Sequence, residues 1–427
     1  MKKSTIFILL FTLNISFAQS TKSEITDDKK IFGLSKLWSD VKYNFVNFDL
    51  VDIDWDKTYQ EYIPKVLATK STYDYYQELI KVMASLKDGH SNVYYTSPDY
   101  GRPPLRTKLI ENKVLVTNVY NDTLVSKNIA IGDEILEINN LNAIEYGKKF
   151  VMPYQSASTV QDLDNRTFHY AFFYGKINEP IVLKIKKKDN SVFTTTISRK
   201  LKSNDKKQSF ELKITKDNIA HLIINDFENK NYRKIFDSLY VNILKSKSKA
   251  LIIDVRNNGG GNGSHGYYIL SHLIDKKIPT SKTKTRQYIP LYKASGYSDI
   301  FLEMSPYFLE PVQNKERYLK PVIVLTSVKT FSAAEDFLVA YDNSKRGIKI
   351  GQRTGGSTGQ PISFDLPEGG KMRICTKRDM YPDGKEFVGI GIIPDIEINE
   401  TIESIQKGKD IVLEKAIEVI NKKPLKS

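Results

Sequence analysis

The 427-residue chain is poor in cysteine, in histidine and in long apolar runs. A single cysteine, Cys375, allows no internal disulfide, so stability must come from packing. The five histidines include no H-x-x-x-H or H-E-x-x-H spacing, and we therefore expect no metal site and no cofactor. No segment reaches the roughly 18 consecutive apolar residues that a membrane-spanning helix needs, so we expect no stable membrane insertion.

The first 18 residues have the pattern of a cleavable secretory signal. Lys2 and Lys3 precede an apolar run from Ile6 to Leu13, and small residues follow at Ser16 to Ala18. A retained N-terminal anchor is the alternative reading. The sequence predicts a signal peptide over residues 1–18 and a periplasmic or extracellular location.

The formal charge of +14 comes from lysines that are dispersed along the chain. They are not accompanied by a zinc knuckle or a basic helix, so a solvated surface is the better interpretation. We expect no nucleic-acid partner.

Residues 19–100 are predicted to form an N-terminal helical domain. Apolar residues recur at helical spacing in two stretches, and a third helix begins at the capping motif starting with Ser71. Gly89 is predicted to end that third helix in the left-handed conformation. His90 then stands between a helix end and a strand start, where backbone on both sides would fix a general base.

Residues 101–203 change to short strands separated by turns. The motif GDEILEINN, from Gly132 to Asn140, resembles a PDZ-like domain, with residues 151–178 as an insertion. Such domains bind extended peptide ends by strand addition. A purely structural spacer is the alternative.

Residues 204–427 alternate strands and helices, which predicts an α/β domain. One strand, from Pro321 to Thr326, leads through a short turn to Ser332 and then into a helix. Ser332 is therefore predicted to lie at a helix N-terminus, where free N–H groups could stabilise a developing anion. The same residues, Ser332 to Glu335, also fit a capping box, so Ser332 could instead be a helix cap.

An acyl-transfer site needs a nucleophile, a base, a group that orients the base, and oxyanion donors. Ser332 and the N–H of Ala333 could supply the nucleophile and one donor. The glycines from Gly259 to Gly261 would allow close approach of a ligand to the backbone. The candidate orienting carboxylates are Glu335, Asp88 and Glu386.

The chain resembles the carboxyl-terminal processing (tail-specific) serine peptidase family in four segments. These are DGHS at Asp88–Ser91, LIIDVRNNGGG at Leu251–Gly261, TFSAAED at Thr330–Asp336 and EFVGIGIIPDIEI at Glu386–Ile398. The resemblance implies a crotonase/ClpP-like α/β protease core with an N-terminal helical domain and a PDZ-like β domain. It also implies hydrolysis of peptide bonds through an acyl-enzyme.

The family has a Ser–Lys form, with the lysine in a T-x-G-K pattern, and a Ser/His/Glu form similar to the tricorn core. The matching run Thr354 to Ser357 lacks the lysine. The resemblance therefore implies the second form, with a catalytic triad and two oxyanion donors: Ser332, His90, Glu386, Ala333 and Gly260.

These observations predict a secreted serine endopeptidase that acts on polypeptides and docks them, through a C-terminal end or another segment, on the PDZ-like module. The alternative is a catalytically inactive peptide- or lipid-binding protein on the same fold. Two finer alternatives stay open: Glu335 rather than Glu386 as the orienting group, and a Ser–Lys dyad that uses Lys371 or Lys377.

Overall fold

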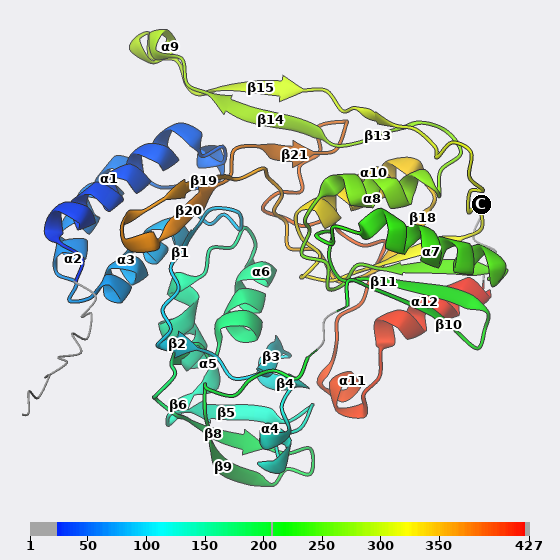
Figure 1. Ribbon diagram of the computed structural model, residues 1–427, viewed down its shortest axis with the longest axis horizontal. Coiled ribbons are helices and arrows are strands. Elements are labelled where there is room, and N and C mark those ends of the chain that lie inside the picture. Colours follow the sequence, from blue (N-terminus) through cyan, green and yellow to red (C-terminus); the bar gives the residue numbers. More distant parts are fainter. Residues whose placement is uncertain (1–23, 206–207, 423–427) are drawn as a thin grey trace, which may run out of the picture.

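The described part of the chain begins with three packed helices (Figure 1). The computed structural model describes residues 24–205 and 208–422, and the predicted signal peptide lies outside these ranges. The helices are α1 (Asp27–Asn44), α2 (Trp55–Leu67) and α3 (Thr72–Ala84). Ser71 caps α3 as predicted, because Asp74 N donates to its hydroxyl at 3.1 Å. The predicted end is wrong: α3 stops at Ala84, and Lys87 (φ 48°), not Gly89, takes the left-handed conformation.

These helices share their core with residues from much later in the chain. Their inward side chains pack against Met372, Ile374 and Cys375. Strand β1 (Asn92–Tyr94) pairs with β20 (Lys371–Ile374), which pairs with β19 (Ile362–Asp365). The loop that carries His90 is therefore held by the C-terminal half of the chain.

A second unit is built on an antiparallel sheet. Its strands, in spatial order, are β3 (Leu105–Ile110), β4 (Lys113–Val119), β5 (Glu134–Ile138), β8 (Ile181–Lys186) and β9 (Val192–Ile197). Its smaller elements are β2 (Tyr100–Gly101), α4 (Asp122–Ser126), β6 (Leu141–Asn142), α5 (Ala143–Tyr146), α6 (Val160–Asn165) and β7 (Gly175–Lys176). A helical turn from Arg166 to Ala171 continues α6 and packs beside the edge strand β3.

The remaining residues form an α/β unit, as predicted. Its six-stranded sheet has the order β10 (Phe210–Ile214), β11 (Ile219–Ile224), β12 (Ala250–Asp254), β17 (Val322–Thr326), β18 (Gly347–Gly351) and β22 (Ile396–Glu397). The pair β10–β11 is antiparallel, and the other neighbours are parallel. Parallel strands buried on both faces need continuous apolar sequence, which β12 and β17 have.

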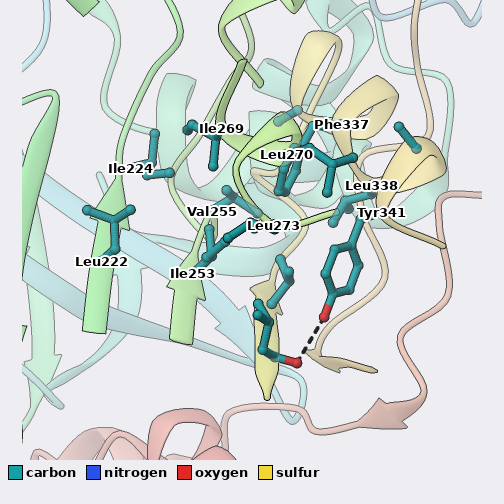
Figure 2. Packing of buried hydrophobic residues seen from close by; sticks show 14 of the residues in the cluster. Leu222, Ile224, Ile253, Val255, Ile269, Leu270, Leu273, Phe337, Leu338 and Tyr341 are labelled. Carbon is teal, nitrogen blue, oxygen red and sulfur yellow. Dashed lines mark hydrogen bonds between the residues drawn. The ribbon is translucent and has the colours of Figure 1, made fainter. Parts of the chain in front are cut away.

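Helices cover both faces of this sheet. One face carries α7 (Tyr232–Lys245), α8 (Gly263–Ser271) and α10 (Ala333–Ser344), and the other carries α12 (Ile411–Lys422), which follows α11 (Ile402–Lys407). Figure 2 shows side chains of α8 and α10 packed over Leu222 and Ile253 of the sheet. The Tyr341 hydroxyl donates to the Val322 carbonyl at 2.9 Å and so fixes α10 to β17. The strand that leads to Ser332 and the helix that follows it are thus rigidly packed.

A long hairpin projects from the α/β unit (Figure 1). Its strands β14 (Lys282–Gln287) and β15 (Ile300–Met304) pair antiparallel, with α9 (Pro290–Ala294) between them. Strand β14 also pairs with β21 (Arg378–Met380), and the short strands β13 (Ile278–Pro279) and β16 (Phe308–Leu309) pair with each other. Over the described ranges, none of the helices has both the length and the apolar character needed to cross a bilayer.

Candidate active site

Ser332 lies at a sharp turn between β17 and α10. Its backbone has φ 58° and ψ −129°, a conformation that costs a non-glycine residue roughly 1–3 kcal/mol. The Ser332 N–H donates to Glu335 Oε2 at 3.2 Å and to the Ser357 carbonyl at 3.1 Å. Ser332 and Glu335 form the capping box that the sequence allows, and Ser332 is in addition held in a strained backbone conformation, which an ordinary helix cap does not require.

His90 meets Ser332 from the opposite side of the site. Its Nε2 lies 2.9 Å from Ser332 Oγ, although the two residues are 242 positions apart in the chain. The backbone N–H of His90 donates to Asp88 Oδ1 at 3.0 Å, and the side chain of Asn47 donates to the other oxygen of that carboxylate at 2.9 Å. The imidazole also stacks on the Phe331 ring at 4.8 Å. The predicted approach of the imidazole to the hydroxyl is present in the structure.

Gly89 has a role that the sequence did not indicate. A Cβ at this position would lie 2.8 Å from the Phe331 ring. Glycine is therefore needed for close packing of the His90 loop against the turn before Ser332, and not for a left-handed helix end.

The surroundings of the His90 imidazole favour its uncharged form. Burial, together with the positive charges of Arg373, Arg166 and Lys377, lowers the pKa of His90 well below its usual range. A neutral imidazole can accept a proton from a hydroxyl, so its electrostatic surroundings suit a general base.

The second ring nitrogen of His90 contacts a hydroxyl and not a carboxylate. Nδ1 lies 2.8 Å from Ser357 Oγ, and both side chains are buried. The predicted contact of Glu386 with His90 is not formed. Glu386 instead accepts a hydrogen bond from Lys284 at 2.9 Å, lies 3.9 Å from the Arg378 guanidinium, and lines another hollow together with Arg378.

Ser357 is the site residue that sequence reasoning missed. It ends the Thr354-to-Ser357 run and occupies the position at which the Ser–Lys form carries its lysine. That replacement was the available signal, since a residue at the position of a catalytic lysine must lie near the nucleophile. Neither lysine proposed for a dyad has a hydrogen bond to Ser332 among the described residues: the Lys371 side chain is 69% exposed, and Lys377 pairs with Asp379 at 2.9 Å.

Glu335 lies beneath the site and organises its loops. Its buried carboxylate accepts hydrogen bonds from Gly356 N at 2.8 Å and Ser357 N at 3.0 Å, and from the Thr354 hydroxyl. Burial raises the pKa of Glu335 to about 8 despite these donors. Glu335 thus contacts the backbone of Ser357 but does not contact the imidazole, so the alternative that it orients His90 directly is not realised either.

The two predicted oxyanion donors differ. Ala333 N, the first N–H of α10, has no acceptor among the described residues. The prediction that the Gly260 N–H is free to bind the oxyanion is wrong. This group donates to Asn258 Oδ1 at 2.9 Å in a local Asx-type turn. Gly260 matters sterically instead: with φ 100°, its position would place a Cβ 2.7 Å from Ser332 Cβ.

The second unit, built on the antiparallel sheet of residues 100–199 and called the sheet unit below, also contacts the site. Ser158 Oγ accepts from Gly89 N at 2.9 Å, and Thr159 donates to the Gly355 carbonyl at 2.9 Å. The Arg166 guanidinium lies 5.2 Å from the centre of the Phe331 ring. The segment around α6 therefore contacts both the His90 loop and the Ser357 loop. Among the described residues, no group of three or more His, Cys, Asp or Glu side chains is placed to hold a metal ion.

Comparison with known proteins identifies two domains in the chain. Residues 218–398 match the model of peptidase family S41, and residues 34–84 match the tricorn protease C1 domain. The chain therefore contains a peptidase family S41 domain preceded by a tricorn C1 domain. These matches confirm the family that the four sequence segments indicate.

Three curated relatives show the same relationship. The chain is 25% identical over 174 residues to the chloroplastic C-terminal processing peptidase of Tetradesmus obliquus, covering 41% of this chain and 34% of the relative. It is 24% identical over 198 residues to the carboxy-terminal-processing protease of Bartonella bacilliformis, covering 46% and 42%. It is 23% identical over 397 residues to the tricorn protease of Thermoplasma volcanium, covering 86% and 34%. The chain thus spans less than half the length of each of these relatives.

Solved structures share the fold over nearly the whole chain. Mature CPAF superposes with a TM-score of 0.76 at 15% identity, covering 92% of this chain and 98% of that one. The photosystem II D1 C-terminal processing protease superposes with a TM-score of 0.53 at 17% identity, covering 91% and 99%. The α/β core is accordingly that of an S41 peptidase fold.

Proposed function

We propose that this protein is a serine peptidase in which Ser332 attacks the substrate carbonyl and His90 accepts the Ser332 proton. The observation that carries the proposal is the 2.9 Å contact between Ser332 Oγ and His90 Nε2, made by a serine in a strained turn. A nucleophile within hydrogen-bond reach of a neutral base is the minimum that serine-dependent acyl transfer requires. The S41 peptidase domain supports the same reaction class.

The proposed reaction begins with His90 in the tautomer that carries its proton on Nδ1. That N–H donates to Ser357 Oγ and leaves Nε2 free to accept the Ser332 proton. As the new bond from Ser332 Oγ to the substrate carbon forms, the carbonyl oxygen becomes an anion that the unpaired N–H of Ala333 can stabilise. His90 then gives its proton to the leaving amine as the peptide bond breaks. Water, deprotonated by His90, hydrolyses the ester and frees Ser332.

Ser357 takes the orienting place that the resemblance assigned to Glu386. In the described structure the hydroxyl of Ser357 is the group on Nδ1, so the imidazolium formed during the reaction gains a hydrogen bond and no opposite charge there. Glu335 supports this arrangement from below by holding the Ser357 backbone at 3.0 Å. We therefore assign Ser357 and Glu335 as positioning residues, and Glu386 to the ion pairs at the neighbouring hollow.

We further propose that the sheet unit is PDZ-like and binds peptide along part of β3. This strand is the edge of its sheet, and its residues from Lys108 to Ile110 line a hollow with Gln161 of α6 and Arg353 of the α/β unit. The preceding carbonyl, of Thr107, already accepts from His169 at 3.0 Å. Strand addition would therefore be confined to the last half of β3.

The proposed substrates are polypeptides, and the proposed location is outside the cytoplasm. The first follows from the reaction class and from the free part of the β3 edge. The second depends on the signal-like residues 1–18.

The test is serine-specific labelling combined with cleavage. The wild-type chain should react with a fluorophosphonate probe and should cut a denatured proteome. Ser332→Ala should lose both activities, and His90→Ala should lose most of the labelling rate. Ser363→Ala, at an exposed serine of β19, should behave as wild type. A folded wild-type chain that neither reacts nor cleaves would contradict the proposal and favour the inactive binding protein.

A further inference from the structure

A hollow between α3 and the sheet unit has five aromatic side chains in its wall. Its volume is about 380 Å³, within the range of roughly 300–1,000 Å³ that is usual for small-molecule sites. None of the residues assigned above to the Ser332 site lines it. We call it the aromatic hollow, after its rings: Tyr73, Tyr146, Phe150, Tyr154 and Tyr174.

Contacts between rings support the wall of the aromatic hollow. Tyr73 of α3 stacks on Tyr100 of β2, with ring centres 3.6 Å apart, and the Tyr100 ring stacks at 6.1 Å on that of Tyr174. Within the sheet unit, the Tyr146 and Phe150 rings lie 5.5 Å apart. The wall therefore combines α3 with the sheet unit, and its rings pack against one another without a ligand.

The aromatic wall is also open to solvent. Phe150 is 45% exposed, and Tyr174 is 40% exposed. Single exposed rings are ordinary on a protein surface, but rings gathered around one concave space are typical of a ligand site.

The charges around the aromatic hollow favour a cation. Asp74 and Glu78 of α3 line it, and no described lysine or arginine does. Glu78 pairs with Lys81 at 2.7 Å, whereas Asp74 has no ion pair among the described residues. The Lys81 ammonium also lies 5.2 Å from the centre of the Tyr154 ring, so one ring of the wall already contacts a cation.

We propose that the aromatic hollow binds a small molecule that carries a quaternary ammonium group. An aromatic ring attracts a cation that lies within about 6 Å of its centre, and cages of several rings recognise quaternary ammonium ligands. Asp74 adds Coulombic attraction to the contacts with the rings, and an anion would be repelled by both carboxylates. This inference does not depend on the proposed peptidase function.

The composition of the wall favours a quaternary over a primary ammonium group. A primary ammonium is a compact and strongly hydrated charge with three donors, so it is held best by several oxygen acceptors. Glu78 is already paired with Lys81, which leaves Asp74 as the one carboxylate of the described wall without a cationic partner. The methyl groups of a quaternary ammonium need no hydrogen-bond acceptor and can contact several rings at once.

Ligands of matched shape test the inference on the full chain. Choline and neohexyl alcohol differ only in that carbon replaces the charged nitrogen. Ligand-observed NMR gives the dissociation constant of each, and we expect that of choline to be about fivefold lower or more. The amide of acetyl-lysine, which carries a primary ammonium, should bind more weakly than choline. Equal binding of choline and neohexyl alcohol, absence of choline binding, or tighter binding of the lysine derivative would each overturn the proposal.

Variants of the wall locate the bound cation. Phe150→Leu and Tyr174→Leu keep an apolar side chain but remove a ring, so each should weaken choline binding on the order of threefold while affecting neohexyl alcohol less. Tyr297→Leu, at a 63% exposed ring before β15, is the control. Circular dichroism shows whether each variant is folded.

Asp74→Asn tests the contribution of charge. It should weaken choline binding and leave neohexyl alcohol unchanged, because only the cation is attracted by the carboxylate. Asp365→Asn, at an acid with an 89% exposed side chain, is the charge-matched control. Choline binding that survives unchanged in Asp74→Asn and in both folded ring variants would place the cation elsewhere and overturn the assignment to the aromatic hollow.

Discussion

The Ser357 hydroxyl lies 2.8 Å from Nδ1 of His90, in the position where a serine peptidase of the Ser/His/Glu type is expected to place a carboxylate. A hydroxyl can fix the tautomer and the orientation of the ring, but it cannot neutralise the imidazolium. The proposed base therefore works with less electrostatic help than a triad provides.

Replacement of Ser357 should affect the reaction more than replacement of Glu386. Ser357→Ala removes the side chain that, among the described residues, contacts His90 Nδ1, so we expect kcat to fall on the order of 10²-fold while KM changes little. Glu386→Gln removes an ion pair with Lys284 and should leave kcat unchanged. Steady-state kinetics on one fluorogenic peptide decide between them. A large loss of kcat in Glu386→Gln, with normal activity in Ser357→Ala, would restore the triad that the sequence predicts.

The acid limb of the pH–rate profile should lie below pH 6.5. Burial lowers the pKa of His90, so the ring stays neutral, and able to accept a proton, until the pH falls through that lowered value. Arg373 contributes to the shift, and Arg373→Gln should therefore raise the pKa of His90 and move the acid limb toward higher pH. The control is Lys371→Gln, at a largely exposed lysine of the same strand. The apparent pKa from kcat/KM between pH 4 and 8 is the measurement, and an unmoved limb in Arg373→Gln would contradict the assignment.

The sequence predicts the parts of the site that local rules control. The apolar strand, the short turn and the helical spacing place Ser332 at a helix N-terminus, and the structure has β17 and α10 in those positions. The helix-to-strand change at His90 is likewise local. Family motifs then indicate which of the five histidines meets Ser332, which no local rule could supply.

Contacts that depend on which of several possible partners lies nearest in space were not predictable. The Gly260 N–H was expected to face a substrate, but the neighbouring Asn258 side chain accepts its hydrogen bond. Glu386 was expected at the imidazole, but the cations of Lys284 and Arg378 hold it elsewhere. The observed partner of the Gly260 N–H is an oxygen acceptor, as a substrate oxyanion would be, and the observed partners of Glu386 are cationic N–H donors, as a protonated His90 would be. Only the positions of these groups in space therefore decide which contact forms.

Stability should fall as the pH rises from about 5 to 8, partly because of Glu335. Burial raises the pKa of Glu335 from 4.5 to about 8, so in this window the folded chain keeps a proton that the unfolded chain has lost. Folding is then favoured at low pH, and the slope is about −1.4 kcal/mol per pH unit for one such proton.

Urea unfolding at several pH values tests this linkage. Glu335→Gln cannot lose a proton, so its free energy of unfolding should depend less steeply on pH between 5 and 8 than that of the wild type. Because the other buried acids, among them Asp336, titrate in both chains, the difference in slope belongs to Glu335. Parallel slopes in the two chains would show that Glu335 is ionised throughout this range, stabilised by its hydrogen bonds from Thr354, Gly356, Ser357 and Ser332.

Adjacent glycines offer a test of the steric requirement at the nucleophile. An alanine at position 260 would place its Cβ 2.7 Å from Ser332 Cβ and 3.0 Å from Ala333 N, at a φ of 100° that disfavours any side chain. The turn must shift, and a displacement of reacting atoms by about 1 Å can cost on the order of 10²-fold in rate. Gly259→Ala is the matched control, since no heavy atom lies within 4 Å of the added Cβ. We expect Gly260→Ala to lose fluorophosphonate labelling and peptide cleavage while Gly259→Ala retains both. Equal activities would mean that Ser332 tolerates displacement, and its strained turn would then have no catalytic purpose.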